Sequence, residues 1–190
     1  MILISKFLIL NINNIDTDLI IPKQFLKTLK KKGFYYCLFY DLRYIINQNN
    51  IFLNYDFPLN IKTNKNVKIL ISKKNFGCGS SREHAVWAIK DFGIKIIIAE
   101  SFSDIFYDNS FKNNLFLIKL KKIEINSIIN NYNVKKNIIF INIKYQFFKF
   151  NNKIYYFNIN MLYKNILLSN FSIIEFLLEK KTEIFLFYKK

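Results

Sequence analysis

The most informative segment of this chain is Asn75-Phe76-Gly77-Cys78-Gly79-Ser80-Ser81-Arg82-Glu83-His84. The apolar run before it, residues 67–72, is typical of a buried strand, and residues 81–92 have apolar positions at helical spacing. The sequence therefore predicts a strand, a glycine-containing turn and the N-terminus of a helix, in that order. Such a turn brings two serine hydroxyls and one guanidinium to unpaired backbone N–H groups, a setting that suits a small carboxylate.

Two properties of this turn favour different interpretations. Gly77 and Gly79 tolerate positive φ, so a ligand can approach the backbone closely at either position. Ser80 and Glu83, however, are spaced as a capping box, in which the serine only closes the end of the helix. Both roles can coexist if the capping bond breaks when a ligand binds, or if Ser81 takes it over. Capping alone gives no reason for the two glycines.

The rest of the chain alternates between strands and helices. We predict strands at 1–10, 67–72, 94–99, 115–120, 137–142, 145–150 and 153–158, and helices at 23–29, 81–92, 103–112, 161–168 and 172–180. Residues 67–99 form a βαβ unit, for which parallel strands and a right-handed crossover are the rule. The polar segment 47–66, which contains Pro58, is predicted to be an irregular loop.

Composition is typical of one globular domain. The chain has 190 residues, of which 52% are apolar and 22% charged, enough to bury a substantial core. We expect a single α/β domain over residues 1–190, with residues 121–190 as a C-terminal strand–helix extension. The apolar N-terminus lacks the basic region of a signal peptide, and no apolar run is long enough to span a membrane.

The cysteines and the one histidine limit the metal chemistry. Cys37 and Cys78 are too few for a disulfide framework, which indicates a reducing cytoplasm. Together with His84 they make neither an ordinary zinc site nor the three thiolates of an iron–sulfur cluster. We expect no metal and no cofactor on this chain.

The formal net charge of +16 raises the question of nucleic acid. The 29 basic residues include only two arginines, Arg43 and Arg82, although arginine is the residue that nucleic-acid sites favour. Lys, Asn, Ile, Phe and Tyr, which have AT-rich codons, are abundant along the whole chain. We therefore attribute the charge to the base composition of the genome. A basic RNA-binding protein without catalysis is the alternative from a different class.

Three blocks, in the same order, connect the sequence to a known family. They are the ten-residue segment, residues 14–26 and residues 92–111. With them the chain resembles the swivel domains of the aconitase superfamily, in particular the family of 3-isopropylmalate dehydratase small subunits. The resemblance implies an α/β fold of the swivelling β/β/α type. It also implies a hydro-lyase that isomerises 2-isopropylmalate and 3-isopropylmalate through 2-isopropylmaleate in leucine biosynthesis.

The same resemblance gives roles to the residues of the central turn. Ser80 corresponds to a general base that removes a proton from the substrate carbon. Ser81 and Arg82, with the backbone of Gly79, correspond to the binding site of a substrate carboxylate. A serine hydroxyl is a weak base, so this role requires the helix N-terminus and the Arg82 cation to stabilise an alkoxide.

Other residues receive roles from the resemblance alone. Asp18 corresponds to an aspartate that pairs with a catalytic histidine of another domain. Lys30 or Lys31 stands near the position of a substrate-binding arginine, although a lysine lacks the planar fork of arginine. Residues 27–36 correspond to a loop that discriminates the substrate side chain; a flexible basic loop without that function is the alternative.

Two neighbours of the turn have competing interpretations. His84 is expected to be structural, because a single histidine is not a ligand set. A helix N-terminus lowers the pKa of a thiol, so Cys78 is either reactive or a spacer. We favour a spacer, because related aconitases have no cysteine in this turn.

The resemblance also implies a partner. Removal of hydroxide from a tertiary carbon requires a Lewis acid. In the family a [4Fe-4S] cluster on a separate large subunit supplies it, so the active site is expected at the interface of a heterodimer. The alternatives of the same class are subunits that act on homoaconitate or a methylated malate. Near the C-terminus the sequence departs from the family, because Asn170, Ser172 and Glu175 stand where a turn usually has glycine and aspartate.

Overall fold

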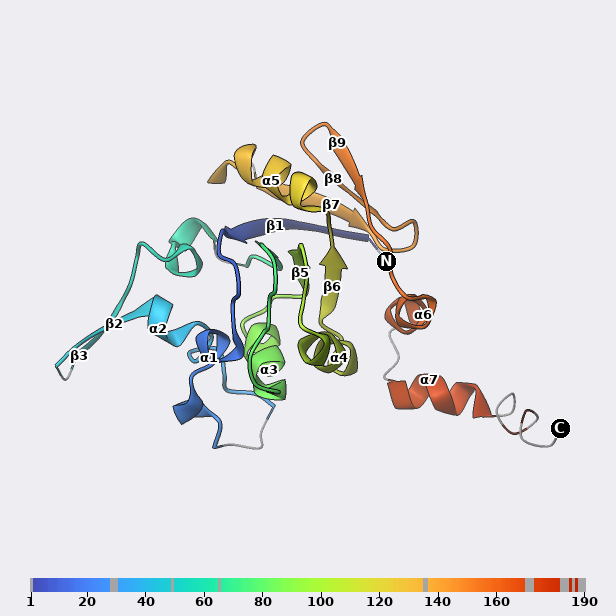
Figure 1. Cartoon of the computed structure of the whole chain (residues 1–190), viewed down its shortest axis with the longest axis horizontal. Helices are drawn as coiled ribbons and strands as arrows, with labels where there is room; N and C mark the ends of the chain where they lie inside the picture. The colour runs from blue at the N-terminus through green and yellow to red at the C-terminus, as the bar shows by residue number, and fades with distance from the viewer. Residues whose placement is uncertain are drawn as a thin grey trace.

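A seven-stranded mixed sheet forms the centre of the computed structural model, which describes residues 2–27, 31–48, 50–64, 66–134, 137–169, 173–181, 185 and 187. The strand order is β6-β5-β4-β1-β7-β8-β9 (Figure 1). The strands are β1 (Ile2–Leu10), β4 (Ile69–Ser72), β5 (Ile96–Ala99), β6 (Phe116–Lys119), β7 (Ile138–Asn142), β8 (Phe147–Phe150) and β9 (Lys153–Tyr156). Strand β1 joins two halves, because it pairs in parallel with β4 and antiparallel with β7.

The parallel half of the sheet is covered on both faces. Strands β4 and β5 are buried at every position, as expected for parallel strands that consist of uninterrupted apolar residues. Leu70 and Ile97 face helices α3 (Glu83–Asp91) and α4 (Asp104–Lys112) in one apolar cluster. Ile69 and Ile96 face the opposite side, where helix α5 (Lys122–Asn130) and the inner face of the antiparallel strands complete a second cluster.

The C-terminal helices α6 (Met161–Ser169) and α7 (Ile173–Glu179) follow strand β9. Tyr163 of α6 is buried in the second apolar cluster, and its hydroxyl donates a hydrogen bond to the carbonyl of Leu115. Burial raises the pKa of Tyr163 well above its ordinary value, so the phenol is a constant donor. Asn170 and Ser172, which were expected to form an unusual turn, lie outside the described residues. The single-domain organisation over residues 1–190 stays a prediction.

Most elements predicted from the sequence are present. All seven predicted strands and four of the five predicted helices are found, with ends that differ by at most two residues. The α/β fold class is confirmed. Strands β4 and β5 are parallel, as expected for a βαβ unit. Helix α5 was not anticipated; Glu124 accepts from the backbone N–H of Lys121 at its start.

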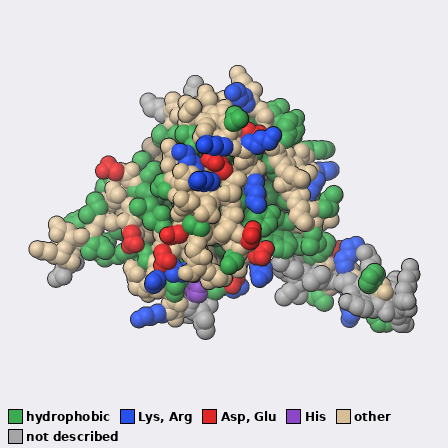
Figure 2. Space-filling model, viewed as in Figure 1, with side chains coloured by type: hydrophobic (Ala, Val, Ile, Leu, Met, Phe, Trp, Pro, Cys, Tyr) green, Lys and Arg blue, Asp and Glu red, His purple; other side chains and the backbone are tan. Residues whose placement is uncertain are grey.

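The expected loop at residues 47–66 is wrong. Strands β2 (Tyr44–Asn47) and β3 (Asn50–Leu53) form an antiparallel hairpin there, followed by two 3-10 turns, Pro58–Asn60 and Lys62–Asn64. The hairpin projects from the body as an arm (Figure 1), and Figure 2 shows the same arm at the left of the molecule. Successive apolar residues of each strand are exposed, so both faces of the hairpin carry apolar side chains. Ile46, Ile51 and Phe52 are each more than half exposed. Polar and apolar residues do not alternate along these two strands, so the sequence lacks the two-residue period that predicts a half-buried strand.

The predicted helix at residues 23–29 is also wrong. It is one 3-10 turn, Lys23–Phe25, preceded by an extended Pro22 and followed by Leu26 outside the helical region. The preceding residues form a short helix instead, α1 (Thr17–Ile20), and helix α2 (Tyr40–Arg43) precedes the hairpin. No helix in the described ranges is long and apolar enough to cross a bilayer.

We predict that Tyr163→Phe destabilises the fold by about 1–3 kcal/mol, the usual cost of a buried polar group left without its partner. The variant keeps the ring in the core and removes only the hydroxyl that binds the Leu115 carbonyl. Urea unfolding followed by circular dichroism measures the loss in the free energy of unfolding. The matched control is Tyr145→Phe at an exposed tyrosine, with an expected change within about 0.5 kcal/mol. Equal stability of the two variants would show that the Tyr163 hydroxyl does not hold α6 to the sheet.

Candidate active site

The loops that leave three parallel strands meet at one edge of the sheet. After β1 and β4, the N–H of Gly77 donates to the carbonyl of Ile15 over 2.7 Å, and the N–H of Thr17 donates to the carbonyl of Cys78 over 2.8 Å. After β5, Phe76 and Phe102 form a further parallel bridge. Because parallel strands end at the same edge, the three sequence blocks become one unit.

Gly77 is required by close packing in this unit. Its φ is +75°, and a Cβ at this position would lie 2.2 Å from Cγ of Phe106 in helix α4. The carbonyl of Gly77 accepts a hydrogen bond from the hydroxyl of Ser103, the N-cap residue of α4. Gly79 has a φ of +91° and more space, with Oγ1 of Thr17 3.3 Å from a Cβ built there. The turn is thus held between the loop after β1 and helix α4.

The capping box proposed for Ser80 and Glu83 is wrong. Helix α3 begins at Glu83, and its N-cap residue is Arg82, with an extended backbone and no side-chain cap. Oε1 of Glu83 instead accepts a 2.7 Å hydrogen bond from Nδ2 of Asn113. The hydroxyl of Thr17 donates to the carbonyl of Ser80 over 3.0 Å, which holds Ser80 outside the helix.

The two serines before the helix are therefore available to a ligand. Ser80 and Ser81 are exposed, and neither hydroxyl makes a hydrogen bond with a residue in the described part of the chain. No capping bond has to be broken before either hydroxyl can bind a substrate.

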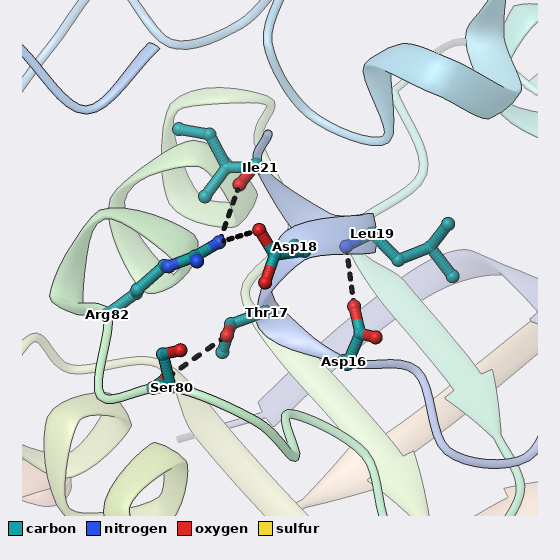
Figure 3. A network of polar contacts seen from close by, with 7 residues as sticks. All are labelled: Asp16, Thr17, Asp18, Leu19, Ile21, Ser80 and Arg82. Atoms are coloured by element: carbon teal, nitrogen blue, oxygen red, sulfur yellow. Dashed lines mark hydrogen bonds and ion pairs between the residues drawn. The ribbon is translucent and has the colours of Figure 1, made fainter. Parts of the chain in front are cut away.

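Arg82 and Asp18 form an ion pair across the two loops (Figure 3). The distance from Nη1 of Arg82 to Oδ1 of Asp18 is 2.6 Å, and Nη1 also donates to the carbonyl of Ile21 over 3.4 Å. The Arg82 side chain is only 8% exposed, whereas Asp18 is 46% exposed. A buried guanidinium requires a counter-charge, so Asp18 neutralises it from the solvent side.

The ion pair leaves half of the guanidinium unused. Among the described residues, Nε and Nη2 of Arg82 have no hydrogen-bond acceptor. These two groups form one edge of the guanidinium, and such an edge can bind both oxygens of a carboxylate. The arrangement suits a ligand carboxylate bound at the Nε–Nη2 edge of Arg82, while Asp18 stays bound to Nη1.

Helix α1, which carries Asp18, is positioned by its own cap. Oδ1 of Asp16 accepts a 2.7 Å hydrogen bond from the N–H of Leu19. Asp16 is thus the N-cap residue of this four-residue helix. Beside it lies an open hollow of about 460 Å³ whose lining includes Asp16, Asp18 and Asp41 together with Lys23. Three acidic residues against one lysine favour a basic group as its occupant.

The remaining predicted site residues lie elsewhere or have other contacts. Lys31 places its ammonium 5.5 Å from the ring centroid of Trp87, in the second turn of α3, rather than beside Ser80. Lys30 lies outside the described residues. His84 packs its ring against Phe34 and Trp87, at centroid distances of 5.6 and 4.5 Å. No group of three potential metal ligands occurs among the described histidine, cysteine and acidic residues.

The expected lowering of the pKa of Cys78 is wrong. Burial raises the pKa of this thiol, and the nearby carboxylate of Asp16 raises it further. Helix α3 begins only at Glu83, so its N-terminus is not at the sulfur. A thiol that stays protonated agrees with a spacer role. Cys37 is buried, and burial raises the pKa of its thiol as well.

Two contacts of the site could not be predicted from local sequence patterns. The ion pair between Arg82 and Asp18 joins residues that are far apart in the sequence, and no local sequence pattern indicates it. The carboxylate of Asp91 accepts hydrogen bonds from the backbone of residues 33–35, which was also not anticipated. An aspartate at the last position of a helix, where the dipole disfavours it, was the available signal.

Comparisons with known proteins agree with this arrangement. The model of the family "Aconitase C-terminal domain" matches residues 8–123. A 3-isopropylmalate dehydratase small subunit from Buchnera aphidicola subsp. Diuraphis noxia is 57% identical over 129 residues, which are 68% of this chain and 61% of the relative. The chain thus spans less than two thirds of that relative's length. A small subunit from Buchnera aphidicola subsp. Pterocomma populeum is 46% identical over 182 residues, 95% of this chain and 87% of the relative.

A solved structure extends the similarity to the whole fold. The crystal structure of 3-isopropylmalate dehydratase (LeuD) from Methanocaldococcus jannaschii has a TM-score of 0.67 and 28% sequence identity, with all of both chains covered. The family match over residues 8–123 and the similarity across most of a relative's length show that this chain belongs to the aconitase C-terminal domain family, among the 3-isopropylmalate dehydratase small subunits.

Proposed function

We propose that this chain is the small subunit of a 3-isopropylmalate dehydratase that interconverts 2-isopropylmalate and 3-isopropylmalate through 2-isopropylmaleate in leucine biosynthesis. The observation that carries the proposal is that one turn presents two exposed serine hydroxyls, which bind no other described residue, next to a buried arginine in the sequence. The names and identities of the relatives support the choice of substrate.

In this proposal Ser80 is the general base and Arg82 binds a carboxylate of the substrate. Ser80 removes the proton from the carbon next to that carboxylate, and hydroxide leaves the neighbouring carbon. The burial of Arg82 supports both roles, because its charge is weakly screened by solvent and stabilises an alkoxide nearby. Ser81 and the backbone of Gly79 complete the carboxylate site beside the N-terminus of α3.

The residues of this chain do not fit an iron–sulfur cluster. The whole sequence has two cysteines; Cys37 is buried in the first apolar cluster, whereas Cys78 lies in the turn. Two thiolates cannot replace the three or four that a cluster requires. We therefore assign the [4Fe-4S] cluster, which would act as the Lewis acid for the leaving hydroxide, to a large subunit.

Two features support a large subunit as the partner in a heterodimer. The acidic hollow beside Asp18 suits a basic side chain, which agrees with a histidine supplied from another domain. The uncharged arm formed by β2 and β3 exposes apolar side chains next to helix α2, which packs against α1. Exposed apolar surface of this kind is typical of protein–protein contacts. The unpaired cysteines agree with a reducing cytoplasm.

The substrate-discriminating loop and the lysine roles are part of the same proposal. Residues 27–36 would face the variable side chain of the substrate, and Lys30 or Lys31 would bind a second carboxylate; Lys31 would have to leave its contact with the Trp87 ring to do so. Figure 2 shows several basic side chains close together in the upper middle of one face, with acidic side chains among and below them. The 29 basic residues include only two arginines, which supports an enzyme subunit rather than an RNA-binding protein, because nucleic-acid sites favour arginine.

We predict that the isolated chain has no isopropylmalate isomerase activity. It lacks a set of ligands for a Lewis acid, whereas the reaction requires one. Addition of a cluster-bearing large subunit should restore turnover, measured by the absorbance of 2-isopropylmaleate. Turnover by the purified, metal-free chain alone would refute the assignment of the Lewis acid to a separate large subunit.

We predict that Ser80→Ala lowers kcat of the assembled enzyme by about 10²–10⁴-fold, the usual contribution of a general base. Because Ser80 is exposed and is not a cap, the free energy of unfolding should change by less than about 0.5 kcal/mol. Ser127→Ala on α5 is the control for kcat, which it should keep; its hydroxyl contacts Tyr155 and Lys153, so the variant serves as a control for activity and not for stability. Near-normal turnover of the Ser80 variant, with normal assembly, would remove Ser80 from the chemistry.

We predict that Arg82→Lys raises KM and lowers kcat, with a combined loss of about 10–100-fold in kcat/KM. A hydrogen bond to a charged group is worth about 1.5–3 kcal/mol, and a lysine cannot offer the Nε–Nη2 edge to a carboxylate. A misplaced carboxylate also misplaces the reacting carbon relative to Ser80, which explains the effect on kcat. Steady-state kinetics of the assembled enzyme, beside thermal unfolding, check it. An unchanged kcat/KM contradicts the carboxylate site.

A further inference from the structure

A long connection between α1 and α2 is tied down at its base and in its middle. At its base the N–H of Phe39 donates to the carbonyl of Ile20 over 2.8 Å, so the two ends of the connection meet. In its middle Oδ2 of Asp91 accepts from three successive N–H groups, those of Gly33, Phe34 and Tyr35, over 2.9, 2.7 and 3.0 Å. Connections of this length with little regular structure usually have a function.

The three hydrogen bonds are of a strong kind. Each joins a backbone N–H to an ionised carboxylate, and charge-assisted bonds are stronger than neutral ones. Successive N–H groups that converge on one anion form a nest, which requires a residue of left-handed backbone. Gly33 supplies it with a φ of +99°. Gly33 therefore gives the loop the backbone conformation in which three N–H groups can bind the Asp91 carboxylate.

Asp91 occupies a position that does not help its own helix. It is the last residue of α3, where a negative charge is opposed by the helix dipole. The three N–H groups of the loop offset this penalty. The location of the carboxylate is therefore explained by the loop and not by the helix.

Further contacts place the same loop along one face of α3. His84, Trp87 and Asp91 lie on a single helix face, by their spacing. Phe34, which is 2% exposed, packs edge-on against His84, and Lys31 lies over Trp87. Residues 31–35 therefore contact helix α3 from its first turn to its last residue.

Helix α3 begins directly after the turn that carries Ser80 and Arg82. A loop fixed along this helix is consequently fixed relative to the turn as well. Beyond the anchored residues, Tyr36 is 69% exposed and leaves an aromatic side chain free to contact a ligand.

We propose that Asp91 is a positioning residue, which sets the place of residues 33–36 relative to Arg82 and so determines how well the enzyme selects the side chain of its substrate. The inference rests on the proposed function, because it takes the substrate to be an alkyl-substituted malate bound at Arg82. It adds a specific residue, Asp91, that holds the loop proposed above to contact the alkyl group.

The test compares Asp91→Asn and Asp91→Ala with the wild type in the assembled two-subunit enzyme. For Asp91→Ala we expect KM for 3-isopropylmalate to rise by about tenfold or more, with kcat within about threefold, since a positioning residue outside the chemistry changes mainly binding. Its preference for 3-isopropylmalate over 3-methylmalate, as a ratio of kcat/KM values, should fall. Asp91→Asn keeps one acceptor oxygen and should lie between the wild type and Asp91→Ala. The matched control is Asp108→Asn on the exposed side of α4, with unchanged kinetics.

Amide hydrogen exchange of the free chain provides a readout that does not depend on activity. In Asp91→Asn the N–H groups of residues 33–35 should exchange faster, whereas those inside α3 should not change. Unchanged exchange at residues 33–35 would overturn the anchoring role. Faster exchange with an unchanged KM and an unchanged substrate preference would overturn the positioning role. If Asp91→Ala does not fold, Asp91→Asn decides.

The failure of the proposed function has a different signature. A wild-type complex that assembles but does not convert isopropylmalate refutes the function and the substrate-selection role with it. The exchange experiment still decides in that case whether Asp91 anchors the loop.

Discussion

The backbone pairing of residues 15–17 with residues 77–78 is the contact on which the site depends. It extends the parallel alignment of β1 and β4 beyond the sheet, into two loops that contain few apolar residues. This pairing sets Asp18 opposite Arg82, and it needs a glycine at position 77 because the ring of Phe106 occupies the space of any side chain. The relative positions of Asp18 and Arg82 are therefore set by main-chain hydrogen bonds, which tolerate changes of the surrounding side chains.

A main-chain scaffold of this kind agrees with the biased composition of the chain. The sequence is rich in Lys, Asn, Ile, Phe and Tyr and has a net charge of +16, yet the turn keeps two glycines, two serines and one of only two arginines. Buried Ile and Phe can replace one another at modest cost when the total volume of the core is kept. No other residue can replace an arginine that binds a carboxylate through two parallel hydrogen bonds. A biased composition of this kind would therefore be tolerated in the core and on the surface but not in the turn.

The sequence predicts those parts of the fold that have a local cause. Strands β4 and β5 are buried on both faces and consist of apolar runs, and Ser103 caps α4 as its position suggests. The hairpin of β2 and β3 was missed because it stands outside the core, so no alternation of polar and apolar residues records it. The capping box at Ser80 failed for a tertiary reason, since Thr17 binds the Ser80 carbonyl from another loop.

The site was predictable in its residue types but not in its connections. The resemblance in the turn indicated Ser80 and Arg82, whereas the ion pair with Asp18 depends on how two strands align. The link from Asp91 to Phe34 spans 57 residues, and its only local sign is an acidic residue at the wrong end of a helix. Long-range contacts of this kind require the fold to be known before they can be inferred.

The electrostatics of the pair explain why the turn is suited to a reaction and not only to binding. Asp18 satisfies the charge of Arg82 in the free chain, so the arginine can stay buried before a substrate arrives. In the proposed function, a substrate carboxylate at the Nε–Nη2 edge would add a second negative charge to one guanidinium. A basic group from a partner at Asp18 would compensate that charge, since the hollow beside Asp18 is open to solvent. Substrate binding at Arg82 and partner binding at Asp18 would then be coupled through one guanidinium, and each would favour the other.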